Sequence, residues 1–161
     1  MSRDIDRAHP RLQPLIPAFI EAVYAETGCD VLITCVDRSA REQANLYALG
    51  RDQATLDAYG ISAIAKPLAR RVTNAKPGES RHNYMIGELA ASLAFDFVPI
   101  RNGKLVWGTS GDGLDEDPDD DRHDDLELWQ RCGAIGERLG MQWAGRWTGS
   151  LREYAHLQID P

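Results

Sequence analysis

An aspartate inside an apolar run is the feature that most restricts how this chain can fold. Residues 93–98 read LAFDFV, with Asp96 as the one polar side chain. Aspartate is disfavoured in strands, and burying its carboxylate is costly unless it is paired, hydrogen-bonded or bound to a metal. We therefore expect residues 93–98 to form a strand that presents Asp96 to partners elsewhere in the chain.

Two histidines are the candidate partners of this aspartate. His82 lies upstream of it, and His156 lies near the end of the chain, three residues after Glu153. A single histidine beside a strand is more often an ordinary polar residue than a ligand. Two histidines, a carboxylate and a further glutamate together favour a hydrolytic zinc site, which takes three protein ligands and leaves a fourth position to water. The HExxH helix of many metalloproteases is absent, so zinc ligands would come from separate elements.

Composition limits the class of protein. The 161 residues are 43% hydrophobic with a formal net charge of −7, which fits one soluble domain and argues against binding nucleic acid or anionic membranes. Three cysteines without CxxC spacing predict reduced, mostly buried thiols. The N-terminus lacks a signal-peptide core, and no apolar run reaches the ~20 residues of a membrane helix. We expect synthesis in a cytoplasm, with no membrane anchor.

Local patterns predict an α+β fold, a small antiparallel sheet flanked by helices. Ser39 and Glu42 have the spacing of a capping box that opens a helix. The acidic run Asp112–Asp125 resembles the start of a calcium loop, but Asp120 stands where such a loop needs glycine, so a solvated loop is favoured. The other predicted elements are a helix from Pro17 to Gly28, a strand over 31–36, a short helix over 51–59, an edge strand over 71–74, a hairpin after Pro99, a helix over 126–139 and a strand over 154–159.

Five segments, in order, resemble the bacteriophage L-alanyl-D-glutamate endopeptidases, which belong with the zinc D-Ala-D-Ala peptidases. Residues 38–51, RSAREQANLYALGR, are similar to the RTxxEQxxLYAxGR signature of that family. The resemblance implies a hedgehog/DD-peptidase-like fold with zinc at the sheet face. Because 161 residues leave no room for a separate wall-binding domain beside it, we expect a single catalytic domain over residues 1–161. The other four segments are VTNAKPGESRHN (72–83), LAFD (93–96), GMQWAGRW (140–147) and EYAH (153–156).

Carried over by position, the resemblance assigns the metal-binding residues. It implies that His82, Asp96 and His156 bind Zn²⁺ and that Glu153 is the catalytic acid. On an extended segment Glu153 and His156 need not align, but a bend near residues 154–155 would let both face the metal.

The same resemblance implies two substrate contacts. Arg38 falls on the arginine that holds the substrate and polarises its carbonyl, and it follows a predicted strand end where a guanidinium can meet a carboxylate. Ser80 falls on the serine that precedes the first zinc ligand.

Between the first histidine and the aspartate this chain departs from the family. Residues Met85–Ser92 are an additional segment, so Glu88 is the alternative third ligand if Asp96 is out of register. The composition of the segment favours a short helical turn or packed loop. Our hypothesis is that it shapes the groove wall and supplies no ligand, and the alternative is an inert surface insertion.

The resemblance implies a zinc peptidase, acting as an endolysin, that cuts the L-Ala-D-Glu bond of the bacterial peptidoglycan stem peptide. We expect a monomer that is made in the host cytoplasm and acts on the wall after release. One alternative is a D-Ala-D-Ala carboxypeptidase or dipeptidase. Another is a zinc-containing wall-binding module without activity, against which Glu153 argues, because a structural site needs no additional acid.

Overall fold

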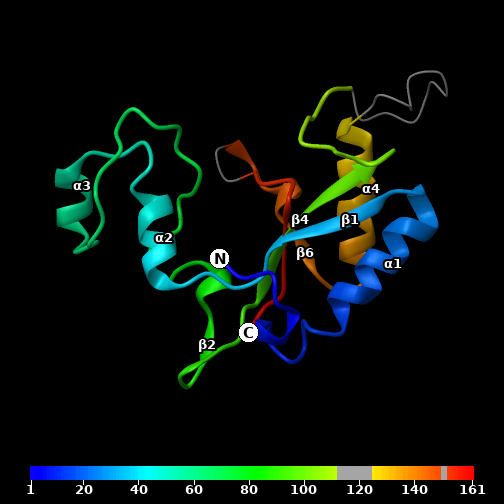
Figure 1. Cartoon of the computed structure of the whole chain (residues 1–161), viewed down its shortest axis with the longest axis horizontal. Coiled ribbons are helices and arrows are strands. Elements are labelled where there is room, and N and C mark those ends of the chain that lie inside the picture. The colour runs from blue at the N-terminus through cyan, green and yellow to red at the C-terminus, as the bar shows by residue number, and fades with distance from the viewer. Residues whose placement is uncertain (112–124, 150–151) are drawn as a thin grey trace.

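An antiparallel sheet forms the centre of the molecule in the computed structural model, which describes residues 1–111, 125–149 and 152–161 (Figure 1). This confirms the predicted α+β class. The neighbouring strands are, in order, β1 (Asp30–Cys35), β4 (Ala94–Arg101), β7 (His156–Gln158) and β6 (Gln142–Trp143), and β5 (Lys104–Leu105) also pairs with β4.

Two helices cover one face of this sheet, α1 (Leu15–Thr27) and α4 (Asp125–Arg138) (Figure 1). The ring of Phe19 on α1 lies 5.6 Å from that of Phe95 and 4.9 Å from that of Phe97. The ring of Trp129 on α4 lies 5.3 Å from that of Phe97. Alternate side chains of β4 are thereby buried on the helix-covered face, and the side chain between them points to the other face.

A second, smaller unit lies to one side of the sheet, and we call residues 39–79 the helical lobe (Figure 1). It contains α2 (Ala40–Tyr47), α3 (Gln53–Ala58) and a long irregular segment up to residue 79. The capping box of Ser39 and Glu42 at the start of α2 is present, as predicted. The lobe has its own buried cluster, made of Ala44, Tyr47, Ala48, Leu56 and Ile61.

Several predicted boundaries need correction. Helix α1 starts at Leu15, before the predicted Pro17, because a proline in the first turn of a helix lacks only an N–H that has no partner there. No strand forms over residues 71–74, which are irregular. The hairpin after Pro99 is confirmed with Asn102 at φ 52° and Gly103 at φ 74°, as a two-residue turn requires.

The additional segment after His82 forms a small hairpin, so the predicted helical turn or packed loop is wrong. It pairs β2 (Met85–Ile86) with β3 (Leu89–Ala90), and Gly87 at φ 61° occupies the tight turn. The hairpin projects away from the sheet, and its apolar side chains are exposed (Figure 1). Glu88 lies at the exposed tip and therefore does not reach the histidines.

The described residues also include three short 3-10 turns, over Ile5–Arg7, Arg81–Asn83 and Ala144–Arg146. None of the described helices has the length and apolar character needed to cross a membrane. Residues 112–124, the bulk of the predicted acidic loop, lie outside the described residues.

Candidate active site

Strand pairing brings Asp96 and His156 together. In the antiparallel pair of β4 and β7 these two residues are direct partners, so their side chains leave the same face of the sheet. That face is the one opposite α1 and α4, because Phe95 and Phe97 point toward the helices. The Nδ1 atom of His156 lies 2.9 Å from Oδ1 of Asp96.

His82 arrives from the short turn Arg81–Asn83. The hydroxyl of Ser80 accepts a hydrogen bond from the His82 backbone N–H at 3.3 Å and so caps this turn. The turn is fixed to the segment after β1, because the Arg38 N–H donates to the His82 carbonyl at 3.1 Å and the Asn83 amide donates to the Arg38 carbonyl. His82 is consequently held in place with 2% of its surface exposed.

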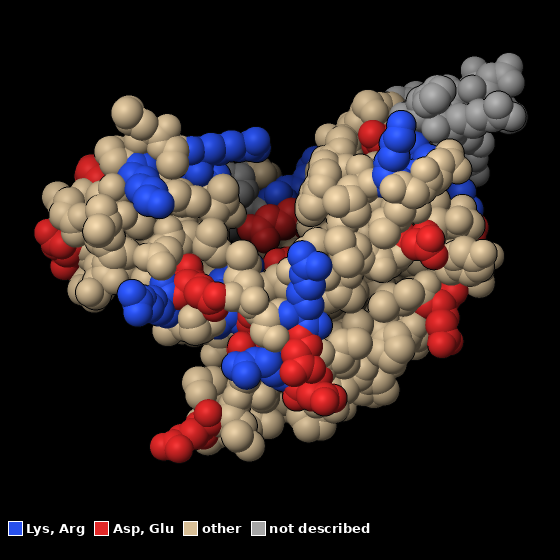
Figure 2. Space-filling view, viewed as in Figure 1, with Lys and Arg blue, Asp and Glu red and all other residues tan. Residues whose placement is uncertain are grey.

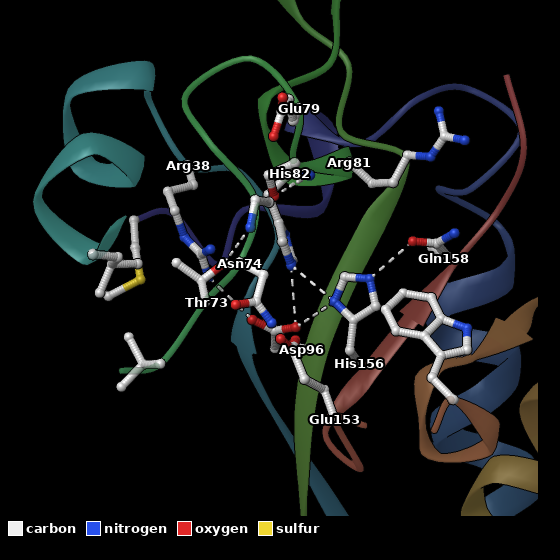
Figure 3. A pocket seen from close by; sticks show the side chains of 16 residues that line it. Arg38, Thr73, Asn74, Glu79, Arg81, His82, Asp96, Glu153, His156 and Gln158 are labelled. Carbon is white, nitrogen blue, oxygen red and sulfur yellow. Dashed lines mark hydrogen bonds and ion pairs between the residues drawn. The ribbon is translucent and has the colours of Figure 1, made fainter. Parts of the chain in front are cut away.

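Three potential ligand atoms converge at this point (Figure 3). The Nε2 atom of His82 lies 3.1 Å from Oδ1 of Asp96 and 3.3 Å from Nδ1 of His156. The structure thus brings together the three residues predicted to bind zinc.

The hydrogen-bond partner of one ring nitrogen of His82, Nδ1, determines whether the other, Nε2, carries a proton. Nδ1 lies 2.7 Å from the carbonyl oxygen of Val36, which can only accept, so Nδ1 carries the proton. Nε2 of a neutral ring then has a free lone pair that points at Asp96 and His156.

A chain of polar side chains fixes the other histidine in the same way. The Asp160 carboxylate accepts from the Gln142 amide nitrogen at 2.7 Å, and the Gln142 oxygen accepts from the Gln158 nitrogen at 3.1 Å. The Gln158 oxygen therefore faces Nε2 of His156, at 3.2 Å, and accepts its proton. Nδ1 of His156 is left with a lone pair directed at Asp96.

Two imidazole lone pairs and a carboxylate oxygen pointed at one another repel unless a positive charge, either a proton or a metal ion, lies among them. Two ligand nitrogens ~2.0–2.1 Å from a tetrahedral zinc ion would lie roughly 3.3 Å apart, as the two histidine nitrogens do. Burial disfavours charge on His82, yet the Asp96 carboxylate raises the pKa of His82 to about 10. Burial acts to raise the pKa of Asp96, but the neighbouring His82 and His156 side chains lower it far below its usual range. The cluster therefore attracts positive charge, and zinc fits it.

Glu153 reaches the cluster through a bend in the backbone. The predicted strand over 154–159 begins only at His156, because residues 154–155 form a turn in which the His156 N–H donates to the Glu153 carbonyl at 3.3 Å. The turn carries the Glu153 side chain to the side of Asp96 (Figure 3). Although the residue is exposed as a whole, desolvation of its carboxyl raises the pKa of Glu153, and His156 acts in the opposite direction.

Arg38 contacts the far oxygen of Asp96. Its Nη2 lies 3.3 Å from Oδ2, while Oδ1 faces the two histidines. Its Nη1 donates at 2.8 Å to the oxygen of Gln43, a fully buried residue. The Gln43 nitrogen donates to the Ala75 carbonyl at 2.7 Å and to the Thr73 hydroxyl at 3.3 Å, so one side chain links Arg38 to the irregular segment of the helical lobe.

The cluster lies at the bottom of a cavity of about 650 Å³ between the sheet and the helical lobe. Thr73 and Ala75 of the lobe form part of one wall, and Trp147, whose ring lies 5.9 Å from that of His156, lines another side. Arg38, Ser80 and Glu153 also line it. Figure 2 shows acidic side chains at the base of this hollow and basic side chains on its rims.

A curated relative has the activity that the family resemblance predicts for this chain. Over 143 residues, 88% of this chain and 68% of the relative, the chain is 31% identical to the peptidoglycan L-alanyl-D-glutamate endopeptidase CwlK of Bacillus subtilis. This chain belongs to that endopeptidase family. No protein-family model matches it.

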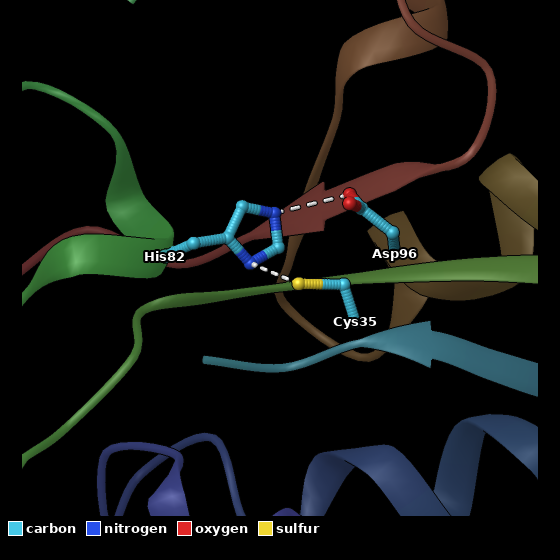
Figure 4. A group of neighbouring side chains, drawn as sticks. All are labelled: Cys35, His82 and Asp96. Carbon is cyan, nitrogen blue, oxygen red and sulfur yellow. Dashed lines mark hydrogen bonds and ion pairs between the residues drawn. The ribbon is translucent and has the colours of Figure 1, made fainter. Parts of the chain in front are cut away.

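One residue near the site of this endopeptidase-family chain was not identified from the sequence. Cys35 is buried, with its sulfur 3.8 Å from Nδ1 of His82, and Cys35, His82 and Asp96 form a possible metal-binding group (Figure 4). However, Cys35 and Asp96 face different nitrogens of the His82 ring, and Nδ1 is already bonded to Val36. The geometry favours His156 over Cys35 as the third ligand.

Two glutamines that position site residues were also not identified from the sequence. Gln43 and Gln158 hold Arg38 and His156, but neither carries chemistry itself. A weak signal existed for Gln158, which alternates with His156 in a predicted strand and so shares its face. For Gln43, the only signal was its place in the segment that resembles the family signature.

Proposed function

We propose that this chain is a zinc-dependent peptidoglycan peptidase that hydrolyses the L-Ala-D-Glu bond of the stem peptide. The observation that carries the proposal is the convergence of His82 Nε2, Asp96 Oδ1 and His156 Nδ1 within 2.9–3.3 Å of one another. The activity of the Bacillus subtilis relative supports the choice of bond.

Zinc held by these three residues would supply a Lewis acid that polarises a peptide carbonyl and lowers the pKa of water toward ~7. Glu153, with its raised pKa, takes a proton from the attacking water and returns it to the leaving amine. Arg38 orients Asp96 through Oδ2, and its place in the cavity wall supports a contact with the oxyanion that develops on the substrate. Ser80 holds His82 through the turn that it caps.

The runner-up is a D-Ala-D-Ala carboxypeptidase, which needs a closed end that grips a terminal carboxylate. A second cavity adjoins the first and shares Glu79 with it, which favours a groove long enough for an endopeptidase. A wall-binding module without activity would not need Glu153 beside the metal-binding cluster.

We further propose the finer features implied by the resemblance. These are a hedgehog/DD-peptidase fold with zinc at the sheet face, and a monomeric phage endolysin that is made in the host cytoplasm and acts on the wall after release. The antiparallel sheet with Asp96 and His156 on its open face supports the fold.

Digestion of purified peptidoglycan, followed by mass spectrometry of the products, tests the activity. We expect new N-terminal D-Glu ends, which depend on zinc and disappear in Glu153→Gln. Release of free D-Ala would instead support the carboxypeptidase, and the absence of any product would support the binding module.

A further inference from the structure

A second cavity of about 610 Å³ lies in the helical lobe, next to the first. Its walls come from the start of α2, from the turn after α3 and from the segment that precedes His82. Glu79 lines both cavities, so the second continues the first along the surface. None of the residues assigned to zinc binding or catalysis lines it.

The charges in this second cavity are unbalanced toward positive. The Glu79 carboxylate is occupied by Lys76, which donates from its backbone N–H at 2.9 Å and from its ammonium at 3.2 Å. The Lys76 ammonium also lies 4.3 Å from the centre of the Tyr59 ring. Arg41 remains as a cation with no ion-pair or hydrogen-bond partner among the described residues.

The segment around the cavity has the same bias. Residues 61–78 contain four basic side chains and no acidic one, in a chain whose net charge is −7. Unpaired positive charge beside a groove attracts anionic ligands and raises their local concentration. The second cavity is thus suited to a carboxylate or another small anion.

The proposed substrate carries such a group. An extended peptide advances ~3.3–3.6 Å per residue, so a stem peptide of several residues extends well beyond the scissile bond. Its C-terminal end bears a free carboxylate in uncrosslinked stems. We infer that the second cavity is a subsite in which Arg41 binds the C-terminal carboxylate of the stem peptide, an inference that rests on the proposed function.

The test compares a synthetic stem pentapeptide with the same peptide amidated at its C-terminus. With wild-type protein we expect amidation to raise KM about tenfold and leave kcat within about twofold, because a charge-assisted hydrogen bond is lost. Arg41→Gln should raise KM for the free peptide by the same factor and remove the effect of amidation, while Arg41→Lys should recover part of it. Lys66→Gln is the matched control. It removes one positive charge of the same segment from an exposed site outside the cavity, where solvent and salt screen it, so KM should stay within about twofold of wild type.

Equal KM values for the two peptides, or equal losses in Arg41→Gln and Lys66→Gln, would overturn the subsite. If wild-type protein cleaves neither peptide, it is the proposed function that fails. Dissociation constants of the two uncleaved peptides, measured by calorimetry with the same variants, then test the subsite by the same comparison.

Discussion

The sheet and the helical lobe build the two sides of one cavity by different means. The sheet side positions its groups through backbone register, as Asp96 and His156 are paired residues of β4 and β7 over a core of large aromatic side chains. The lobe side has no strand at the cavity. Its wall at residues 73–75 is held by side chains, namely Gln43 and Arg51, which donates to the Thr73 carbonyl at 2.9 Å.

This difference indicates which side of the cavity is rigid and which can change shape. Register in a packed sheet is discrete, so the side chains of Asp96 and His156 cannot shift along their strands without breaking the sheet. A wall held by a few hydrogen bonds over a small apolar cluster opens at a lower free energy than the core does. We therefore expect the sheet to fix the reactive groups and the lobe to set the width of the groove.

Replacement of Glu153 should have the largest effect and should be confined to catalysis. Glu153→Gln keeps the shape of the side chain but removes its ability to transfer a proton, so we expect kcat to fall by ~10²–10⁴-fold. Zinc content and thermal unfolding should match wild type. Near-normal turnover of peptidoglycan fragments would remove Glu153 from the mechanism.

Truncating one core side chain under the sheet and one in the helical lobe should separate effects on stability from effects on the shape of the groove. Phe19→Ala, between Phe95 and Phe97, should lower the free energy of unfolding by ~3–5 kcal/mol, measured by urea denaturation. Leu56→Ala should lower the free energy of unfolding of the helical lobe by ~2–5 kcal/mol. It should also raise KM, while zinc is retained. A Leu56→Ala protein with unchanged KM would show that the lobe does not shape the groove.

Sequence reasoning was most successful on the sheet side, for a physical reason. Asp96 in an apolar run and the strand predicted around His156 are local patterns, and strand geometry converts them directly into positions on one face. The link from Gln43 to Ala75 joins residues 32 positions apart and leaves no periodic signal, so the lobe wall could not be predicted. The hairpin at Met85–Ala90 was missed because Gly87 with short flanking runs is a weak turn signal.

Breaking the chain of polar side chains behind His156 should have an intermediate effect, a loss of zinc affinity. Gln158→Leu removes the acceptor that keeps the proton on Nε2, and loss of such an outer partner typically costs 10–100-fold in metal affinity. Competition with a chromophoric chelator measures this. Gln13→Leu, remote from the cavity, is the control, and unaltered zinc affinity in Gln158→Leu would refute the role of the chain.

The hairpin should have the smallest effect. Because its apolar side chains are exposed and none lines the cavity, replacing residues 85–90 by a two-glycine bridge should leave zinc binding and KM nearly unchanged. The earlier expectation that this segment shapes the groove wall predicts a raised KM instead. Steady-state kinetics on one soluble stem peptide distinguish the two.

The central claim is that zinc is held by His82, Asp96 and His156, and elemental analysis of matched variants tests it most directly. The account predicts about one zinc per chain in wild type and in Cys35→Ser, because the sulfur faces the protonated nitrogen of His82. It predicts loss of zinc in His156→Ala and retention in the control His9→Ala. Zinc retained in His156→Ala but lost in Cys35→Ser would contradict the account and assign the metal to the group of Cys35, His82 and Asp96.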